Sequence, residues 1–183
     1  MIVVFLADGF EEIEAVSVID VLRRAEYPVC TVAVGTPARR VTGAHNMVLE
    51  ADCLESELDG RDIEMVVLPG GMPGTLNLEK SQVVQQVLKD CHEQGKWITA
   101  ICAAPSILGH MGLLEGKTAI CFPGFEEALT GAAISTQAVC RDGKIITAKG
   151  PGVAIEFALE LVQAVSGDSL ANDLRMSMQC QSK

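Results

Sequence analysis

The sequence predicts a doubly wound α/β sandwich, in which a mainly parallel β-sheet carries helices on both faces. Short apolar runs that are typical of buried strands alternate along the chain with amphipathic stretches that have helical periodicity. Several apolar runs end abruptly at turns, as strands do where sites form at the carboxyl edge of a parallel sheet. The chain has 183 residues, enough for one well-buried domain and short for two, so we expect a single domain over residues 1–183.

The first half of the chain contains three apolar runs and one clear amphipathic helix. The N-terminal run lacks a basic segment and a cleavage site and is too short to cross a membrane, so we interpret it as a strand. In order, we expect a strand at Ile2–Ala7, a helix at 11–25, a strand at Val29–Val34, extended pieces near Val41 and at 47–50, and a strand at Met65–Leu68.

The second half continues the alternation and contains two strong local signals. Ser81 is a good N-cap and Gly95 a good terminator for the helix between them. Asp142-Gly143 between two short runs predicts a two-residue hairpin turn. In order, we expect a helix over 81–94, a strand leading into Cys102, a helix with Pro105 in its first turn, a short strand at 117–121, a hairpin over 138–147, and a core helix that opens at Gly150-Pro151-Gly152 and ends near Gly167. This order is that of a flavodoxin-like fold.

Charge and cysteine usage narrow the class of protein. The formal net charge is −10 and no run of Lys or Arg occurs, so we expect neither nucleic acid nor a membrane as a partner. The seven cysteines include no Cys-x-x-Cys pair and no Cys/His cluster, which predicts neither a zinc site nor a disulfide framework. We therefore expect a reduced, cytoplasmic protein without a metal or another cofactor.

One cysteine stands in a position suited to chemistry. The segment A-I-C-A-A-P, residues 100–105, places Cys102 between an apolar strand and the first turn of a helix. A strand, an abrupt turn and a helix expose a nucleophile and aim backbone N–H groups at it. The positive end of the helix dipole favours a thiolate, so we expect a lowered pKa for Cys102. The other six cysteines are more typical of core packing.

A carboxyl group is the second candidate. Glu14 falls on the same face of the first helix as Val18 and Leu22, and one turn deeper than Glu11, for which we expect a capping role. A carboxylate on a buried face is costly unless it is paired or protonated. Both Glu14 and Cys102 follow carboxyl ends of strands, so we expect a protonated Glu14 that donates a hydrogen bond to the sulfur. The alternative is that Glu14 only satisfies backbone groups.

The candidate site would also need backbone donors and a general base. Gly70 and Gly71 follow a buried strand and can turn their N–H groups into the cleft, where the N–H of Ala103 joins them as a candidate oxyanion hole. A general base is harder to find. His110 lies eight residues beyond Cys102, too far along the helix to touch it, His92 is expected in solvent, and His45 lies in the irregular segment. A cysteine peptidase or amidase is therefore disfavoured.

The first helix also carries apolar residues on its outer face. Ile13 and Val16 project away from the core side, next to Asp20 and Arg24. Apolar residues on a face expected to be wet indicate a partner surface, and a symmetric homodimer is the simplest proposal. The alternative is two scattered exposed residues.

At these residues the chain resembles the ThiJ/PfpI superfamily, and most closely its DJ-one-like branch, the Parkinson-disease deglycase type. Four motifs in order carry the resemblance over nearly the whole chain: D-G-F-E-E-I-E at 8–14, V-L-P-G-G at 67–71, A-I-C-A-A-P at 100–105 and G-P-G at 150–152. The resemblance implies that Cys102 is an oxidisable nucleophile, Glu14 its protonated partner, and Gly71 and Ala103 the backbone donors. It also implies a homodimer built around the first helix. Phe122 stands where some relatives carry a histidine, which argues against the peptidase activity of the PfpI branch.

The resemblance implies two functional hypotheses. The first is a glyoxalase- or deglycase-type enzyme of oxidative or carbonyl stress that acts on small α-oxoaldehydes or on their adducts with thiols and amines. Cys102 would form a hemithioacetal and Glu14 would shuttle protons between adjacent carbons. The second is a non-catalytic redox sensor or chaperone in which Cys102 becomes a sulfinate. The old link of ThiJ to thiamine biosynthesis is disfavoured, because no motif in the chain cradles ATP phosphates. We favour the enzyme.

Overall fold

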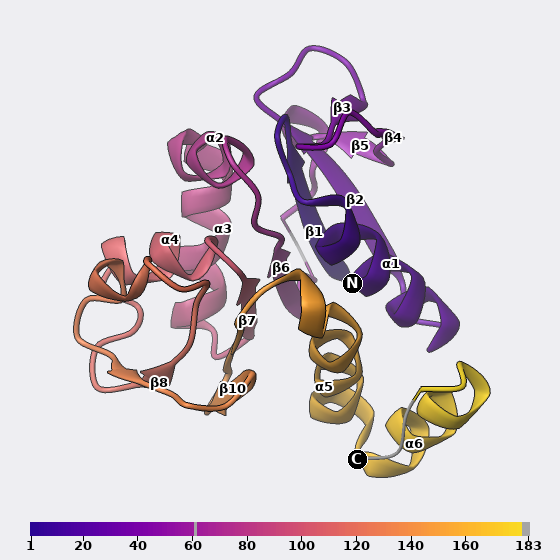
Figure 1. The fold of residues 1–183 in the computed structure, drawn as a ribbon. Coiled ribbons are helices and arrows are strands. Elements are labelled where there is room, and N and C mark those ends of the chain that lie inside the picture. The colour runs from indigo at the N-terminus through magenta and orange to yellow at the C-terminus, as the bar shows by residue number, and fades with distance from the viewer. Residues whose placement is uncertain (61, 181–183) are drawn as a thin grey trace.

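A seven-stranded sheet forms the centre of the computed structural model, which describes residues 1–60 and 62–180 (Figure 1). The strands lie in the order β10-β11-β7-β6-β1-β2-β5. Their bounds are β1 (Ile2–Ala7), β2 (Val29–Val34), β5 (Cys53–Leu54), β6 (Met65–Leu68), β7 (Trp97–Ile101), β10 (Val139–Asp142) and β11 (Ile145–Ala148). All neighbours are parallel except β10 and β11, which form the hairpin predicted at Asp142-Gly143. The central order β2-β1-β6-β7-β11 is that of a flavodoxin-like sheet, so the predicted fold class is confirmed.

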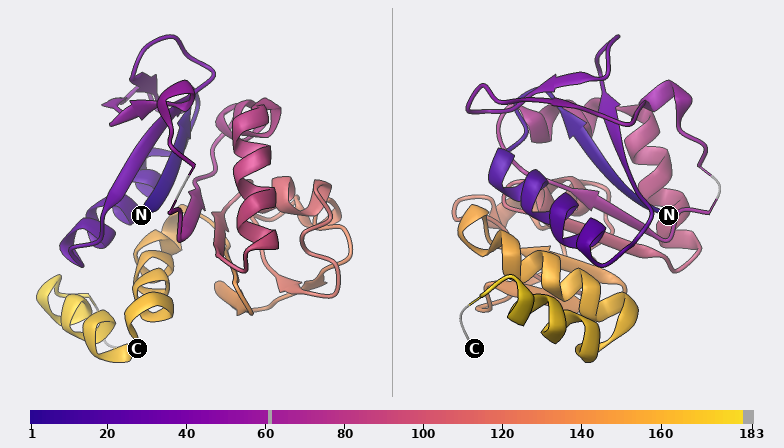
Figure 2. Two further views of the ribbon diagram at one scale, coloured as in Figure 1. Left: turned by 180° about the vertical axis from the view of Figure 1, so that it is seen from behind. Right: turned by 90° about the vertical axis from the view of Figure 1, so that its right-hand side faces the viewer.

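Helices cover both faces of this sheet. Their bounds are α1 (Glu12–Arg24), α2 (Gly74–Lys80), α3 (Gln82–Glu93), α4 (Pro105–His110), α5 (Ala154–Ser166) and α6 (Asp168–Ser177). Figures 1 and 2 show α1, α5 and α6 on one side of the sheet and α2, α3 and α4 on the other. Single 3₁₀ turns lie at Glu55–Glu57, Glu126–Ala128 and Pro151–Val153. None of the helices in the described part of the chain is long and apolar enough to cross a membrane.

The alternation of side chains along β1 shows why its sequence is continuously apolar. Ile2, Val4 and Leu6 enter the core under α1 and α5, whereas Val3 and Phe5 enter the core under α2, α3 and α4. Every residue of β1 is therefore buried, as expected for a parallel strand that is covered on both faces.

The strand register brings several loops together at one edge. Ala7 at the end of β1 is level with Val34, and Leu68 at the end of β6 is level with Ala100 of β7. The chain segments that follow β1, β6 and β7 therefore leave the sheet side by side. This edge holds the start of α1, the Pro69-Gly70-Gly71 turn and Cys102.

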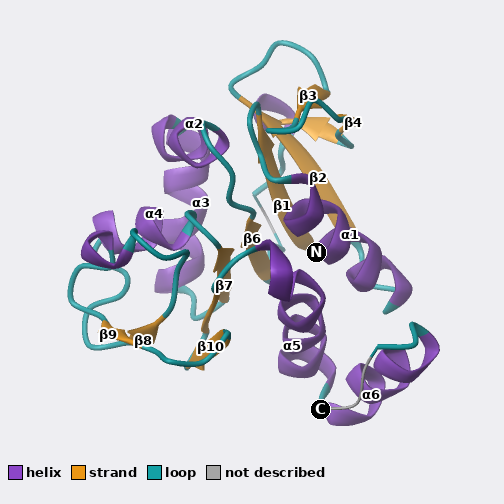
Figure 3. Cartoon of the chain, viewed as in Figure 1, coloured by secondary structure: helices purple, strands orange, loops and turns teal. Residues whose placement is uncertain are grey.

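Some elements differ from the sequence predictions. The strand expected at 117–121 is reduced to β8 (Thr118–Ala119), which pairs with β9 (Ala133–Ile134) in a small separate sheet. The extended pieces near residues 41 and 47–50 pair as the antiparallel strands β3 (Arg40–Thr42) and β4 (Val48–Glu50). Strand β5 and helices α2 and α6 were not predicted. Figure 3 shows that loops make up much of the segment between α4 and β10.

Candidate active site

Cys102 occupies a sharp turn between β7 and α4. Its φ of 65° lies in the left-handed region, which is unfavourable for a residue with a side chain. Two hydrogen bonds hold this conformation: the Cys102 N–H donates to the carbonyl of Ala148 over 2.9 Å, and the N–H of Phe122 donates to the Cys102 carbonyl over 2.7 Å. The strand–turn–helix arrangement expected from the sequence is therefore present, with its strain placed on the cysteine.

Glu14 lies beside Cys102, with Gly70 between them. A side-chain carbon built on Gly70 would lie 2.7 Å from Cβ of Cys102 and 2.9 Å from Oε2 of Glu14, so both groups touch the space that this glycine leaves free. Glu14 has no exposed surface, and Glu11 caps the helix by accepting the Glu14 N–H over 2.8 Å, as the sequence indicated. Two groups that are 88 positions apart in sequence are thus neighbours at one sheet edge.

The two oxygens of the Glu14 carboxyl differ in their surroundings. Oε2 accepts a hydrogen bond from the N–H of Gly70 over 2.8 Å. Oε1 is buried and has no hydrogen-bond partner among the residues that the structure describes. An unpartnered buried oxygen costs less on a neutral carboxyl group than on a carboxylate, so the pattern fits a protonated Glu14.

The backbone donors need one correction. The N–H of Gly70 serves Glu14 and is therefore not free to act on the sulfur or on an oxyanion. The N–H groups of Ala103 and Gly71 act on the sulfur of Cys102 and lower the pKa of its thiol. Gly71 has a φ of 89°, and a side chain there would collide with the backbone of Gly9 and Glu11, so its conformation and its position both require glycine.

Burial dominates the electrostatics of Glu14. Desolvation raises the pKa of Glu14 to about 7, and the charge of Glu11 acts in the same direction, whereas hydrogen bonds with Gly70 and Cys102 lower it. A carboxyl group with this pKa exchanges its proton near neutrality. A protonated Glu14 is therefore accessible under ordinary conditions, whereas its hydrogen bond to a thiolate of Cys102 stays a prediction.

The pKa of Cys102 differs from the sequence prediction. Burial, the charge of Glu14 and the hydrogen bond with Glu14 raise the pKa of the thiol to about 12, and they outweigh the N–H groups of Ala103 and Gly71, which lower it. The expectation of a lowered pKa counted the helix terminus but not the loss of solvent around the sulfur. The two titrations are coupled, so between about pH 7 and 12 the pair Glu14–Cys102 holds one proton and one negative charge.

The histidines have other partners. His45 Nδ1 lies 2.9 Å from Oε2 of Glu12, and His110 Nδ1 lies 2.5 Å from Oε1 of Glu79. His92 is exposed on α3. Burial opposes ionisation of Glu12, yet hydrogen bonds from the side chain and backbone of His45 lower its pKa, and the same contact raises the pKa of His45. The ligand atoms of Glu11, Glu12 and His45 lie within 4.8 Å of one another, so these residues are the described group best able to hold a metal ion.

The outer face of α1 carries the two residues expected at a partner surface. Ile13 is 57% exposed and Val16 is 41% exposed. Ala15, Val18 and Leu22 on the opposite face are buried, as predicted. The homodimer itself stays a prediction.

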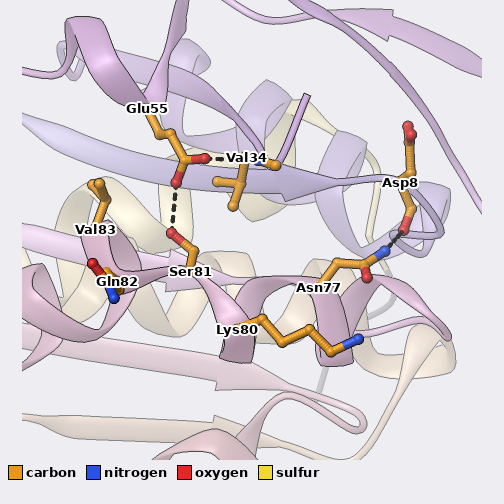
Figure 4. A pocket seen from close by; sticks show the side chains of 9 residues that line it. Asp8, Val34, Glu55, Asn77, Lys80, Ser81, Gln82 and Val83 are labelled. Atoms are coloured by element: carbon orange, nitrogen blue, oxygen red, sulfur yellow. Dashed lines mark hydrogen bonds between the residues drawn. The ribbon is translucent and has the colours of Figure 1, made fainter. Parts of the chain in front are cut away.

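A separate hollow of about 540 Å³ lies between the end of β2 and the start of α3 (Figure 4). Glu55 lines it and accepts hydrogen bonds from the Gly35 N–H over 2.8 Å and from the hydroxyl of Ser81 over 2.5 Å. Asp8, Asn77 and Lys80 complete its polar wall. Neither Cys102 nor Glu14 lines this hollow, so it is distinct from the candidate active site.

Two contributions to the site were missed by sequence reasoning. Gly70 acts as a spacer and as the donor that orients Glu14, and Ala148 anchors the cysteine turn from β11. The Gly-Gly turn in the sequence was a usable signal for the role of Gly70. Nothing in the sequence near Ala148 indicated its role, because that role depends on the pairing of β11 with β7.

A flavodoxin-like sandwich with a cysteine on a strand–helix turn and a buried carboxyl group beside it defines a class of α/β proteins. Within this class, a model described as the DJ-1/PfpI family matches residues 1–164, and the chain belongs to that family.

Individual relatives agree with this assignment. Protein DJ-1 homolog B of Arabidopsis thaliana is 38% identical over 168 residues, which cover 91% of this chain but 38% of that relative, so the chain spans well under half its length. Glutathione-independent glyoxalase DJR-1.2 of Caenorhabditis elegans is 30% identical over 167 residues, or 90% of this chain and 87% of that relative. The solved structure of oxidized Toxoplasma gondii DJ-1 superimposes with a TM-score of 0.94 at 35% identity and covers 97% of both chains.

Proposed function

We propose that this chain is a cysteine-dependent enzyme that acts on small, reactive α-oxoaldehydes or on their adducts with thiols and amines, in the manner of a glyoxalase or deglycase. The contact of Cys102 with the fully buried Glu14, whose pKa is raised to about 7, carries this proposal. The relative from Caenorhabditis elegans that is named as a glyoxalase supports it. We further propose that the protein is a cytoplasmic homodimer, in keeping with its seven free thiols and the exposed face of α1.

The accessibility of the sulfur favours small substrates. Cys102 keeps 9% of its surface exposed, and Glu14 keeps none. A compact aldehyde can reach a sulfur that is exposed to this extent, whereas a peptide bond within a folded chain would need a wider cleft. The partial exposure of Phe122, next to the cysteine turn, offers an apolar surface for the substrate carbon chain.

The reaction follows from the shared proton of the pair. As the sulfur of Cys102 attacks the aldehyde carbon, the proton of the pair resides on Glu14, and the N–H groups of Gly71 and Ala103 stabilise the developing oxyanion. Protonation of that oxygen gives the hemithioacetal. Glu14 then removes the hydrogen on the attacked carbon and returns a proton to the adjacent carbon, which gives a thioester. Hydrolysis releases the 2-hydroxy acid and the free thiol, so one water is consumed and no electrons leave the substrate.

The experiment is lactate formation from methylglyoxal by the full chain in the absence of glutathione. We expect turnover in the wild type, loss to background in Cys102→Ser, and a loss of at least about 100-fold in Glu14→Gln. Cys180→Ser is the matched control, because it removes a thiol outside the site, and it should keep wild-type turnover. Absence of turnover in the wild type, or turnover that survives in Cys102→Ser, would contradict the proposal.

A redox sensor is the second candidate function. The N–H groups of Gly71 and Ala103 that lower the pKa of the thiol can also stabilise a sulfinate, and a similar solved structure is that of oxidized Toxoplasma gondii DJ-1. Mild peroxide treatment followed by mass spectrometry distinguishes this function. Addition of two oxygens at Cys102, in a protein that does not turn over methylglyoxal, would favour the sensor over the enzyme.

A further inference from the structure

Two other cysteines lie next to each other, far from Cys102 in sequence. Cys30 belongs to β2 and Cys53 to the neighbouring strand β5, and their Sγ atoms are 3.5 Å apart. Both are free thiols that are only partly buried. The sequence predicted core packing for both cysteines. The pairing of β2 with β5 produces a close dithiol that the spacing of the cysteines does not reveal.

The residues beside these cysteines hold the two strands together. Asp52 Oδ2 accepts hydrogen bonds from the N–H and from the hydroxyl of Thr31, each over 2.8 Å, and the Asp52 N–H donates to the carbonyl of Thr31 over 3.0 Å. Arg23 adds an ion pair to the same Asp52 oxygen at 2.9 Å. Because Thr31 follows Cys30 and Asp52 precedes Cys53, these contacts keep the two sulfurs adjacent.

The geometry also permits a small closing movement. A disulfide needs a sulfur–sulfur distance of about 2 Å, so the two sulfurs must approach by roughly 1.5 Å. Strand β5 has two residues, Cys53 and Leu54, and it forms the edge of the sheet. A short edge strand with a neighbour on one side can shift at lower cost than a central strand.

We propose that Cys30 and Cys53 form a reversible intramolecular disulfide, a redox-modification site that is separate from Cys102. The oxidant is a low-molecular-weight disulfide such as oxidised glutathione. Burial, followed by the hydrogen bond and charge of Cys53, raises the pKa of Cys30 to about 12, which disfavours the Cys30 thiolate as the first nucleophile.

The disulfide forms by two successive thiol–disulfide exchange steps. The Cys53 thiolate attacks one sulfur of the oxidant, forms a mixed disulfide and releases one small thiolate. Cys30 then gives its proton to solvent and attacks the Cys53 sulfur, which expels the second small thiolate. Two protein thiols are oxidised to one disulfide, and the oxidant is reduced to two thiols.

The disulfide between Cys30 and Cys53 would close a covalent loop, and residues of this loop contact the start of α1. The segment between the two cysteines contains β3 and β4 and the loop that places His45 against Glu12. Closure of a loop of this length restricts the unfolded chain. The oxidised protein should therefore melt at a temperature higher by roughly 5–10 °C than the reduced protein.

Peptide mapping of the full chain tests the proposal. The reduced protein is incubated with oxidised glutathione, its remaining thiols are alkylated after denaturation, and it is digested with trypsin. Cleavage after Arg39 and Arg40 separates Cys30 from Cys53. We expect one linked pair of peptides with a mass two hydrogens below the sum of the reduced peptides, and its loss after treatment with dithiothreitol.

Matched variants separate this site from the proposed active site. Cys30→Ser and Cys53→Ser should each abolish the linked peptides and the rise in melting temperature, whereas Cys102→Ser and Cys180→Ser should keep both. The Cys102→Ser result does not depend on the proposed enzymatic function. Stable glutathione adducts at Cys30 or Cys53 without the cross-link, or a cross-link between two chains on a non-reducing gel, would overturn the proposal.

Discussion

At the scale of single residues, burial of Glu14 accounts for the chemistry of the candidate site. Its carboxyl has no exposed surface and one oxygen without a hydrogen-bond partner in the described part of the chain, so ionisation is costly and the pKa rises to about 7. The same charge, once formed, opposes ionisation of Cys102. The pair therefore acts as one titrating unit, and a change at Glu14 must be felt at the sulfur.

Substitution of Glu14 should move the pKa of Cys102 in a direction that depends on the new side chain. Glu14→Gln removes the negative charge and keeps a polar group, so it should lower the thiol pKa by about one unit or more. Glu14→Leu also removes the charge but adds apolar surface and offers no hydrogen bond, so its thiol pKa should stay above that of Glu14→Gln. The measurement is the pH dependence of iodoacetamide alkylation at Cys102, followed by peptide mapping. Identical profiles in all three proteins would remove Glu14 from the site.

The raised pKa of Glu14 also predicts a dependence of stability on pH. The folded-state value of about 7 lies above the ordinary value of 4.5, so the folded chain binds this proton more tightly than the unfolded chain. This contribution to stability is complete below about pH 4.5 and is lost as the pH rises through 7. Urea unfolding at pH 4.5 and pH 8 should show Glu14→Gln gaining about 3 kcal/mol relative to the wild type over this range. A constant difference between the two proteins would contradict the prediction.

At the scale of elements, the apolar pattern of the sequence was sufficient to predict the strands and helices that are long or have a clear capping residue. Strands β1, β2 and β6 have their predicted bounds, and Ser81 caps α3 by accepting the Val84 N–H. Helix α2 has seven residues and no side-chain cap, so it gives little periodic signal. Strand β5 has two residues, and its existence depends on β2 as a partner. Short elements that tertiary contacts create could not be predicted from local sequence.

In the candidate site, too, local sequence predicted some features and tertiary contacts determine the others. The turn at Cys102 and the buried position of Glu14 follow from a strand–helix junction and from helical spacing, both of which are local. The role of Gly70 as a spacer between Cys102 and Glu14 depends on how β6 ends against β7 and α1. The raised pKa of Cys102 depends on the exclusion of solvent by these elements. The sequence therefore predicted which side chains meet, but not the electrostatic balance between them.

At Gly70 the neighbouring side chains of Cys102 and Glu14 leave no space for a side chain. In Gly70→Ala the new carbon would lie 2.7 Å from Cβ of Cys102 and 2.9 Å from Oε2 of Glu14, so the two groups must move apart. We expect methylglyoxal turnover to fall by about 100-fold and stability by roughly 1–3 kcal/mol. Gly60→Ala is the matched control, since a side chain there meets none of the neighbouring atoms that the structure describes within 4 Å, and it should leave turnover unchanged. Equal turnover in both variants would show that the spacing at Gly70 does not matter.

At the scale of the whole molecule, parallel strand register is what assembles the site. Strands β1, β6 and β7 end at one edge, so a helix start, a glycine turn and a cysteine turn meet there although they are dispersed over the chain. The layers of helices on both faces leave the outer side of α1 uncovered, with Ile13 and Val16 exposed. No contact among the described residues covers these two side chains, and the proposed homodimer would bury them.

A charge on this face of α1 should therefore dissociate the proposed homodimer. Val16→Asp, and in a second variant Ile13→Glu, would place a carboxylate where the partner chain would exclude water, and an unpaired buried charge costs about 3 kcal/mol or more. We expect the dimer dissociation constant to rise by at least about 100-fold, measured by sedimentation equilibrium. Met176→Glu is the control: Met176 on α6 is 65% exposed, so a carboxylate there should leave the association unchanged. A wild-type chain that sediments as a monomer, or a dimer that withstands both α1 variants, would show that this helix is not the contact surface.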